Sequence, residues 1–276
     1  MRFAHKLSKL TDGQAWQSVQ RHLGLALLAR RPVFRLDPKR FADSINNQRF
    51  EQIRQRYAIP NPGIGWQKYL DLSTWIPVNL RRVRDLRLDF GFHKRILDIG
   101  CGTGYFLYLC RWLGHDVLGL DINDVPMYGE ITRMLGLGRV LWRVKAFEPL
   151  PCLGSRFDLI TCFAICFNEH GSKTVWRSAE WQFFLDDLAL RLRPGGKIHL
   201  RLNRESTGNF YDQELRRLLE ARGAEIERNK ITICPGKRSG ARLVTTGNRA
   251  GLKRPAKVGQ LQPLLTKTHS VAAHSR

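Results

Sequence analysis

Short apolar runs alternate with amphipathic segments from residue 96 to residue 203. Apolar residues spaced at i, i+3, i+4 and i+7 predict helices, and the short continuous runs between them predict buried strands. This alternation is typical of a parallel sheet with helices on both faces. The predicted strands are Ile96–Ile99, Val117–Leu120, Val140–Val144, Leu159–Phe163 and Lys197–Leu202.

Three helices are predicted within this region and just after it. The first ends at Gly114, the second at the break "RPGG", and the third at Gly223, after which a single strand is predicted from Ile226 to Cys234. Glycine directly after the last apolar position is a common stop signal. The apolar positions are Phe106, Leu109, Cys110 and Leu113 in the first helix, Trp181, Phe184, Leu185, Leu188 and Leu192 in the second, and Tyr211, Leu215, Leu218 and Leu219 in the third.

The chain divides into three parts. Residues 1–90 predict a helical N-terminal extension or lid, interrupted by the loop "IPNPGIG". Residues 91–248 predict the α/β domain, with a Rossmann-like, doubly wound and mostly parallel sheet. Residues 249–276 predict a disordered basic tail, because they contain no acidic residue and little apolar periodicity.

The N-terminal part contains one apolar stretch, "LGLALLA", at residues 23–29. It is too short to span a bilayer, so no transmembrane segment is predicted. The arginines that follow it replace the small residues of a signal-peptide cleavage site. A surface helix with Trp16, Val19, Leu23 and Leu27 on one side is expected, and an organelle transit peptide is the alternative.

The net charge of +22 is unevenly distributed. The balance of basic over acidic residues is +12 over residues 1–95, +1 over residues 96–234 and +9 over residues 235–276. Basic flanks of this kind can dock on nucleic acid, an anionic membrane surface or a phosphorylated substrate. They can equally be solvated extensions that bind nothing, and the sequence leaves both interpretations open.

The cysteines indicate an intracellular protein. The chain has six, and none forms a Cys-x-x-Cys pair or a disulfide-like framework. Several lie in apolar runs, which is typical of reduced core residues in a cytoplasmic protein. Their positions are 101, 110, 152, 162, 166 and 234.

A glycine-rich turn, "DIGCGTG", follows the first predicted strand. The dinucleotide fingerprint G-x-G-x-x-G would place its third glycine at position 105, which is Tyr105. The phosphate-binding pattern that ends in Gly-Lys-Ser/Thr is absent as well. The pattern present is D-x-G-x-G-x-G, formed by Asp98, Gly100, Gly102 and Gly104.

This loop and its surroundings resemble the class I S-adenosylmethionine-dependent methyltransferases (methyltransferase domain type 11/23-like). "ILDIGCGTGYF" is similar to the first motif of that family and "VLGLDIN" to the second. "VKAFEPLP" is similar to the segment beside the adenine, "RFDLITCFA" to the fourth strand, and "LALRLRPGGKIHL" to the fifth strand with its preceding helix and turn. The five pieces occur in the family's order over about residues 96–234. The resemblance implies S-adenosyl-L-methionine as cofactor and methyl transfer as activity.

The resemblance also implies a cofactor site. Asp121 ends the second strand, where its carboxylate can accept two hydrogen bonds from the ribose diol. Gly100 and Gly102 leave space for the methionyl part. Asp98 either orients the ammonium group of that part or is a structural carboxylate that caps loop amides. The expected cofactor-binding residues are Asp98, Gly100, Cys101, Gly102, Gly104, Asp121, Ile122 and Phe147.

The adenine segment departs from the family pattern. An acidic residue often begins it in the family, whereas this chain has Ala146 there. The adenine is therefore expected to rely on backbone groups and on Phe147 and Leu150.

Acceptor residues in this family follow the fourth strand, which here continues as "AICFNEHG". His170 is the candidate general base and Glu169 the second candidate, because a hydroxyl acceptor must lose a proton during transfer. Both side chains can equally be solvated loop residues.

Beyond the fifth strand, Asn203, Arg204 and Glu205 are expected to face the same acceptor region. Arg201 or Arg204 could bind an anionic substrate group, although basic residues beside a strand end are commonly just surface residues. No metal site is predicted.

Three functions fit these patterns. The first is methyl transfer to a small-molecule, glycan or lipid-linked acceptor, with residues 1–90 as part of a lid. Aromatic and basic residues of that lid suit a sugar or phosphate, although the same residues can simply pack the lid on the core. The second is an RNA or protein methyltransferase that docks through the basic flanks, and the third is a non-catalytic module that keeps the cofactor pocket. The lid residues are Trp66, Tyr69, Trp75, Arg81 and Arg82.

Overall fold

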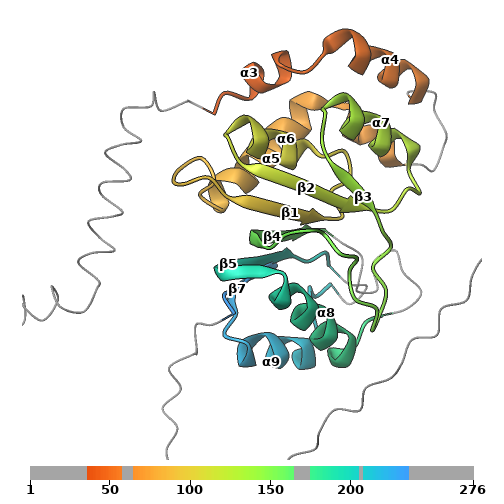
Figure 1. The fold of residues 1–276 in the computed structure, drawn as a ribbon. Coiled ribbons are helices and arrows are strands. Elements are labelled where there is room, and N and C mark those ends of the chain that lie inside the picture. The colour runs from red at the N-terminus through yellow and green to blue at the C-terminus, as the bar shows by residue number, and fades with distance from the viewer. Residues whose placement is uncertain (1–35, 58–64, 165–174, 205–207, 236–276) are drawn as a thin grey trace, which may run out of the picture. The chain divides into compact units, whose positions relative to one another are not determined.

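Seven strands form one sheet in the order β3-β2-β1-β4-β5-β7-β6 (Figure 1). This is seen in a computed structural model that describes residues 36–57, 65–164, 175–204 and 208–235. The first five strands of that order are parallel, and β7 is antiparallel to both β5 and β6. The strands are β1 (Arg95–Ile99), β2 (Asp116–Asp121), β3 (Arg139–Leu141), β4 (Phe157–Phe163), β5 (Leu192–Arg201), β6 (Glu225–Glu227) and β7 (Lys230–Ile233).

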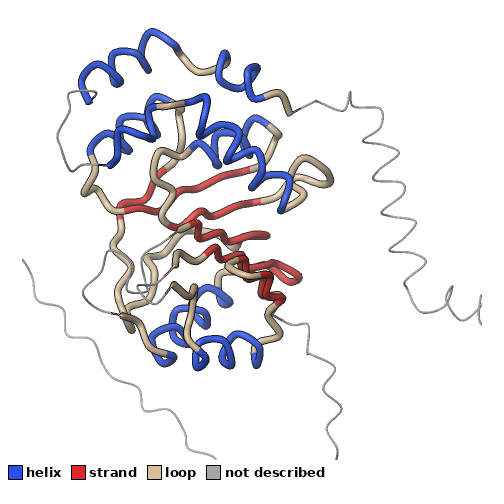
Figure 2. Tube along the Cα trace, turned by 180° about the vertical axis from the view of Figure 1, so that it is seen from behind, coloured by secondary structure: helices blue, strands red, loops and turns tan. Residues whose placement is uncertain are grey.

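Helices cover both faces of the sheet (Figures 1 and 2). Helices α3 to α7 lie on one face and helices α8 and α9 on the other. The predicted Rossmann-like, doubly wound architecture is therefore confirmed. The helical elements are α3 (Pro38–Asp43), α4 (Asn47–Tyr57), the 3-10 helix η1 (Gly65–Leu70), α5 (Leu72–Asp85), α6 (Tyr105–Trp112), α7 (Pro126–Met134), α8 (Ser178–Leu190) and α9 (Gln213–Ala221).

Each face of the sheet has its own hydrophobic core. Side chains alternate between the two faces along a strand, so Ile96 of β1 packs with α3–α7 while Leu97 and Ile99 pack with α8 and α9. All three are essentially inaccessible to water. Because strands buried on both faces must be apolar throughout, the continuous apolar runs in the sequence identified them correctly.

The strand order reverses between β1 and β4. From β1 the chain moves outward to β2 and β3, then crosses back to β4 on the other side of β1. In open α/β sheets, ligands bind beyond the carboxyl ends of the strands at such a switch point. In this protein that point lies where β1 and β4 end side by side, with Ile99 paired to Cys162.

The single strand predicted from Ile226 to Cys234 is wrong. The structure has a hairpin, β6 and β7, joined by the two-residue turn Arg228–Asn229. Arg228 has φ +56°, the left-handed conformation that normally favours glycine. Because Arg-Asn is not one of the usual dipeptides of a two-residue hairpin turn, the sequence pattern did not predict a turn here.

Two other boundaries differ from the predicted ones. The "RPGG" segment lies inside β5, where the register against β4 shifts, and Leu192 begins this strand instead of ending α8. A Cβ at Gly196 would lie 3.0 Å from the Phe157 carbonyl oxygen, so the close approach of β5 to β4 requires glycine there. Strand β3 is shorter than predicted and ends at Leu141.

The N-terminal extension is helical where it is described, through α3, α4, η1 and α5. The surface helix predicted around Trp16 and the basic tail predicted for residues 249–276 lie outside the described residues. Among the residues that are described, no helix is both long and apolar enough to cross a membrane.

Candidate functional site

The glycine loop connects β1 to α6 at the switch point. The amide of Gly100 donates to the Leu120 carbonyl at 2.7 Å, which ties the loop to β2. A Cβ at Gly104 would lie 2.6 Å from Leu137 Cδ1, so this glycine permits close packing. Gly102 differs, because the atom nearest to its hypothetical Cβ is Tyr128 Cε2 at 4.0 Å. The loop is thus packed at its helix end and open at Gly102.

Asp121, the last residue of β2, binds this loop directly. Its carboxylate accepts a hydrogen bond from the Gly102 amide, and a second at 2.8 Å from the Ile122 amide. Burial raises the pKa of Asp121, and these two amides oppose that shift. The residues that the sequence placed 19 positions apart therefore meet at one point.

Asp98 is buried one strand away, in β1. Its Oδ1 accepts a hydrogen bond from Thr161 Oγ1 at 2.7 Å, and only 2% of the residue is exposed. Burial raises the pKa of Asp98 to about 7, while the Thr161 hydrogen bond and the positive charge of Arg82 oppose this shift. No loop amide donates to Asp98 among the described residues, so a cationic ligand group would add a partner that stabilises the charged carboxylate.

Arg82 of α5 lies over the end of β4. Its Cζ is 4.4 Å from the centroid of the Phe163 ring, and Nη1 donates to Asn79 Oδ1 at 2.9 Å. Nε is buried and has no hydrogen-bond partner among the described residues. Burial lowers the pKa of Arg82 to about 10, although the charge of Asp98 acts in the opposite direction. A buried cation with an unused donor fits an anionic ligand group.

Part of the N-terminal extension packs beside the glycine loop. The Tyr105 hydroxyl donates to the Tyr69 carbonyl at 2.9 Å, and the Tyr69 ring contacts Tyr128 at 5.6 Å between centroids. Tyr69 also packs on Trp75, at 4.4 Å. These aromatic side chains therefore join the lid to the core, as one of the two interpretations of the lid residues expected.

The other predicted cofactor residues lie at different depths. The Cys101 side chain is buried against Gly119, and Ile122 contributes its backbone amide to Asp121. Phe147 is 56% exposed with φ +57°, and its ring is 5.9 Å from that of Phe183 on α8. The structure thus gathers Asp98, the glycine loop, Asp121 and Ile122, while Phe147 is placed against α8.

The acceptor side is only partly described. Both predicted catalytic residues, His170 and Glu169, lie outside the described residues. Asn203, after β5, donates its side-chain amide to the carbonyl of Ala164 at 3.0 Å. Asn203 and Ala164, which follow β5 and β4, are therefore in contact.

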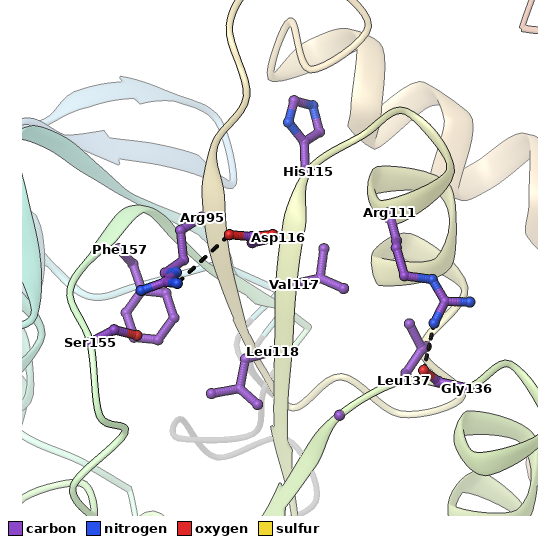
Figure 3. A pocket seen from close by; sticks show the side chains of 11 residues that line it. Arg95, Arg111, His115, Asp116, Val117, Leu118, Gly136, Leu137, Ser155 and Phe157 are labelled. Atoms are coloured by element: carbon purple, nitrogen blue, oxygen red, sulfur yellow. Dashed lines mark hydrogen bonds and ion pairs between the residues drawn. The ribbon is translucent and has the colours of Figure 1, made fainter.

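A cavity of about 420 Å³ opens at the opposite edge of the sheet, at the amino ends of β1, β2 and β4 (Figure 3). Arg95 pairs with Asp116 at 3.7 Å across it. Arg111 donates to the carbonyls of Leu135 and Gly136. Because these charged groups are engaged within the protein, we assign no ligand to this cavity.

Comparison with known proteins agrees with the site. Residues 96–196 match a family model described as a methyltransferase domain. The ubiquinone biosynthesis O-methyltransferase of Sinorhizobium medicae is 31% identical over 142 residues, covering 48% of this chain and 54% of that protein. The tRNA U34 carboxymethyltransferase of Campylobacter hominis is 29% identical over 110 residues, covering 39% of this chain and 35% of that protein.

Among solved structures, the crystal structure of Streptomyces venezuelae DesVI has a TM-score of 0.44 and 15% identity, covering 57% of this chain and 91% of that chain. The chain spans about half the length of the first curated relatives it matches. The family model and these relatives support a methyltransferase domain over residues 96–196.

The sequence pattern missed Thr161 and gave Arg82 a different role, as a lid residue suited to a sugar or phosphate. Thr161 lies within an apolar strand run, and Arg82 is one of four arginines in the stretch 81–87. Only strand register and helix packing bring them to Asp98. The position of Thr161 in β4 opposite Asp98 would have been visible once the β1–β4 pairing was known.

Proposed function

We propose that this chain is an S-adenosylmethionine-dependent methyltransferase that acts on a small-molecule, glycan or lipid-linked acceptor. The observation that carries the proposal is the contact between the Gly102 amide and the Asp121 carboxylate at the carboxyl ends of β1 and β2. This contact joins the open glycine loop, which leaves room for the methionyl part of such a cofactor, to the strand-end acid, which accepts from its ribose.

The residues present fit this cofactor. Asp121 is the acceptor for the ribose hydroxyls, and the open side of Gly102 leaves room for the methionyl part. The amino-acid end of the cofactor carries one positive and one negative group. Asp98 would hold the ammonium group, and the unused Nε donor of Arg82 would hold the carboxylate. The buried pair thus matches both charges of a zwitterion.

The bound cofactor supplies a methyl carbon activated by a positively charged sulfur. The chain's own task is to hold the acceptor in line with that carbon and to exclude water. The packed aromatic lid of Tyr69 and Trp75 closes one side of the glycine loop. For a hydroxyl acceptor, His170 would accept the proton, with Glu169 as the second candidate base.

One observation supports the acceptor class, and a second supports the compartment in which the enzyme works. Two of the curated relatives act in ubiquinone biosynthesis by their names, and this chain resembles them over about half their length. The described core also carries four free cysteines that are buried or partly buried, Cys101, Cys110, Cys162 and Cys234. Reduced thiols in these positions support a cytoplasmic enzyme.

The test begins with the purified full-length chain and isothermal titration with S-adenosylmethionine. Tritiated methyl transfer into cell extract follows, with the products sorted into lipid, small-molecule, protein and RNA pools. Label in the lipid or small-molecule pool supports the proposal. Cofactor binding without label in any pool would instead indicate the non-catalytic module.

An RNA acceptor is the second candidate, because the tRNA U34 carboxymethyltransferase of Campylobacter hominis resembles this chain over 110 residues. The basic flanks would then dock on the phosphate backbone, and binding would weaken steeply with salt. Label in the RNA pool, lost when residues 235–276 are deleted, would favour this candidate over the first.

A further inference from the structure

Two arginines contact the same aromatic ring at the carboxyl edge of the sheet, and neither pairs with an acidic residue of the described ranges. Arg204 follows β5, and Arg228 is the first residue of the β6–β7 turn. Their Cζ atoms lie 5.4 Å and 5.7 Å from the centroid of the same Phe210 ring. Within the described ranges, neither guanidinium forms an ion pair with a carboxylate. Both cations lie within 6 Å of one ring, so an anion that reached both guanidiniums would be stabilised by two positive charges.

The hairpin turn is built to hold this position. Asn229 is anchored twice to Leu202, through its side-chain amide and its carbonyl, each at 3.0 Å. The Tyr211 hydroxyl donates to the Arg228 carbonyl at 2.9 Å. Arg228 nevertheless has φ +56°, a conformation in which glycine is the favoured residue of a two-residue turn. Strained backbone of this kind is common at ligand-binding positions.

The neighbouring cations are already engaged. Lys230, the first residue of β7, pairs with Asp85 of α5 at 2.8 Å. Arg82 lies over Phe163 and is assigned to the cofactor. Arg204 and Arg228 are both exposed, and neither forms an ion pair with a carboxylate of the described residues.

This pair lies beside the acceptor side of the site. Because β7 is antiparallel to β5, Lys230 lies opposite Arg201 and the turn before it falls at the carboxyl end of β5. Asn203, the residue before Arg204, bonds the carbonyl of Ala164 after β4. Arg204 therefore follows a residue that contacts Ala164, where the described part of β4 and its exit ends.

We propose that Arg204 and Arg228 together bind a carboxylate or phosphate group of the methyl acceptor, with the Phe210 ring as the surface on which both guanidiniums lie. The inference rests on the proposed methyl transfer and narrows its substrate class to anionic acceptors. Planar guanidiniums suit both groups because each can donate two parallel hydrogen bonds.

The test uses nuclease-treated extract, separated into an aqueous small-molecule fraction and a detergent-dispersed lipid fraction. Each is incubated with the full-length chain and tritiated S-adenosylmethionine, and the product is passed over an anion-exchange resin at neutral pH. We expect the labelled product to be retained and to elute with salt. Label in the aqueous fraction identifies a soluble acid or phosphate ester, and label in the lipid fraction identifies an anionic lipid.

Two variants connect this result to the arginines. Arg228→Gly keeps the turn, because glycine prefers its backbone conformation, and Arg204→Met keeps the apolar stem. Each is expected to raise KM for the labelled fraction about tenfold or more, with kcat and cofactor affinity nearly unchanged. The double variant should lose less than the product of the two single effects, since both residues bind one group. Arg216→Met, on the exposed face of α9, is the matched control and should have no effect.

A labelled product that passes through the resin, or an unchanged KM in both single variants, would overturn the anionic-acceptor inference while leaving methyl transfer intact. Absence of label from every fraction would overturn the proposed methyl transfer, and this inference with it.

Discussion

The backbone amide of Gly102 donates a hydrogen bond to the carboxylate of Asp121. The first residue belongs to the turn after β1 and the second ends β2, so the bond links the two elements that a nucleoside-containing cofactor must contact. Asp121 is thus a loop anchor and, in the proposed function, also a ligand acceptor. The two roles can be separated experimentally.

Asp121→Asn is expected to weaken S-adenosylmethionine binding by about a hundredfold, because charge-assisted hydrogen bonds are about twice as strong as neutral ones. The loop anchor is retained in part, since the amide oxygen still accepts from Gly102. Isothermal titration gives the affinity, and urea unfolding should show a loss of at most about 1 kcal/mol. A variant with near-normal affinity would remove Asp121 from the cofactor site.

Cofactor affinity should depend on pH through Asp98. Its pKa is raised to about 7, so below this pH the folded chain holds the carboxyl group protonated and unable to pair with an ammonium group. Affinity is therefore expected to fall by up to about tenfold per pH unit as the pH decreases below 7. Titrations between pH 5 and 8 would measure it, and Asp98→Asn should flatten the profile. An identical profile in both proteins would contradict this role.

Asp98 also affects the stability of the chain without cofactor, but with the opposite pH dependence: stability falls as the pH rises, whereas cofactor affinity falls as the pH decreases. The folded pKa exceeds the ordinary value of 3.8, so the folded state binds the proton more tightly than the unfolded state. The contribution to the free energy of unfolding is thus present below about pH 4 and is lost as the pH rises to about 7. Urea unfolding would measure this. Between about pH 4 and pH 7 the free energy of unfolding of the wild-type chain should decrease relative to that of Asp98→Asn.

Arg82→Met separates cofactor binding from packing. Methionine preserves much of the apolar stem over Phe163 and removes a buried donor, Nε, that has no partner among the described residues. We expect cofactor affinity to fall about tenfold to a hundredfold, while the melting temperature without cofactor is unchanged or higher. If the melting temperature fell sharply and affinity did not, Arg82 would be structural.

Two glycines of the loop should respond differently to alanine. At Gly104 the new Cβ would lie 2.6 Å from Leu137 Cδ1, at φ +75°, so a loss of about 2–4 kcal/mol of stability is expected. At Gly102 the space is open and φ is +54°, so the loss should be only about 1–2 kcal/mol. Cofactor affinity should instead fall more in Gly102→Ala than in Gly104→Ala. Denaturant melts and titrations on both variants give the comparison.

His170→Ala is expected to reduce turnover by about a hundredfold or more without changing cofactor affinity, as removal of a general base does. Glu169→Gln provides the comparison for the second candidate. Turnover is measured on the labelled fraction identified with tritiated cofactor. If His170→Ala keeps full turnover, His170 has no part in proton removal.

The sequence by itself determined the alternation of strands and helices, the glycine loop and the strand-end position of Asp121. These features are local, because buried parallel strands must be apolar runs and a loop pattern is read from a few adjacent residues. The hairpin at Arg228 escaped prediction because packing against Leu202 and Tyr211, not turn chemistry, holds that backbone.

Only the tertiary structure decided which charges share a site. Thr161, Asp98 and Arg82 come from β4, β1 and α5, and strand register together with the packing of α5 brings them together. The same holds for Arg204 and Arg228 on the Phe210 ring. Sequence spacing sets what each residue can do, whereas burial and distance set the strength of its charge interactions, and both are properties of the folded chain.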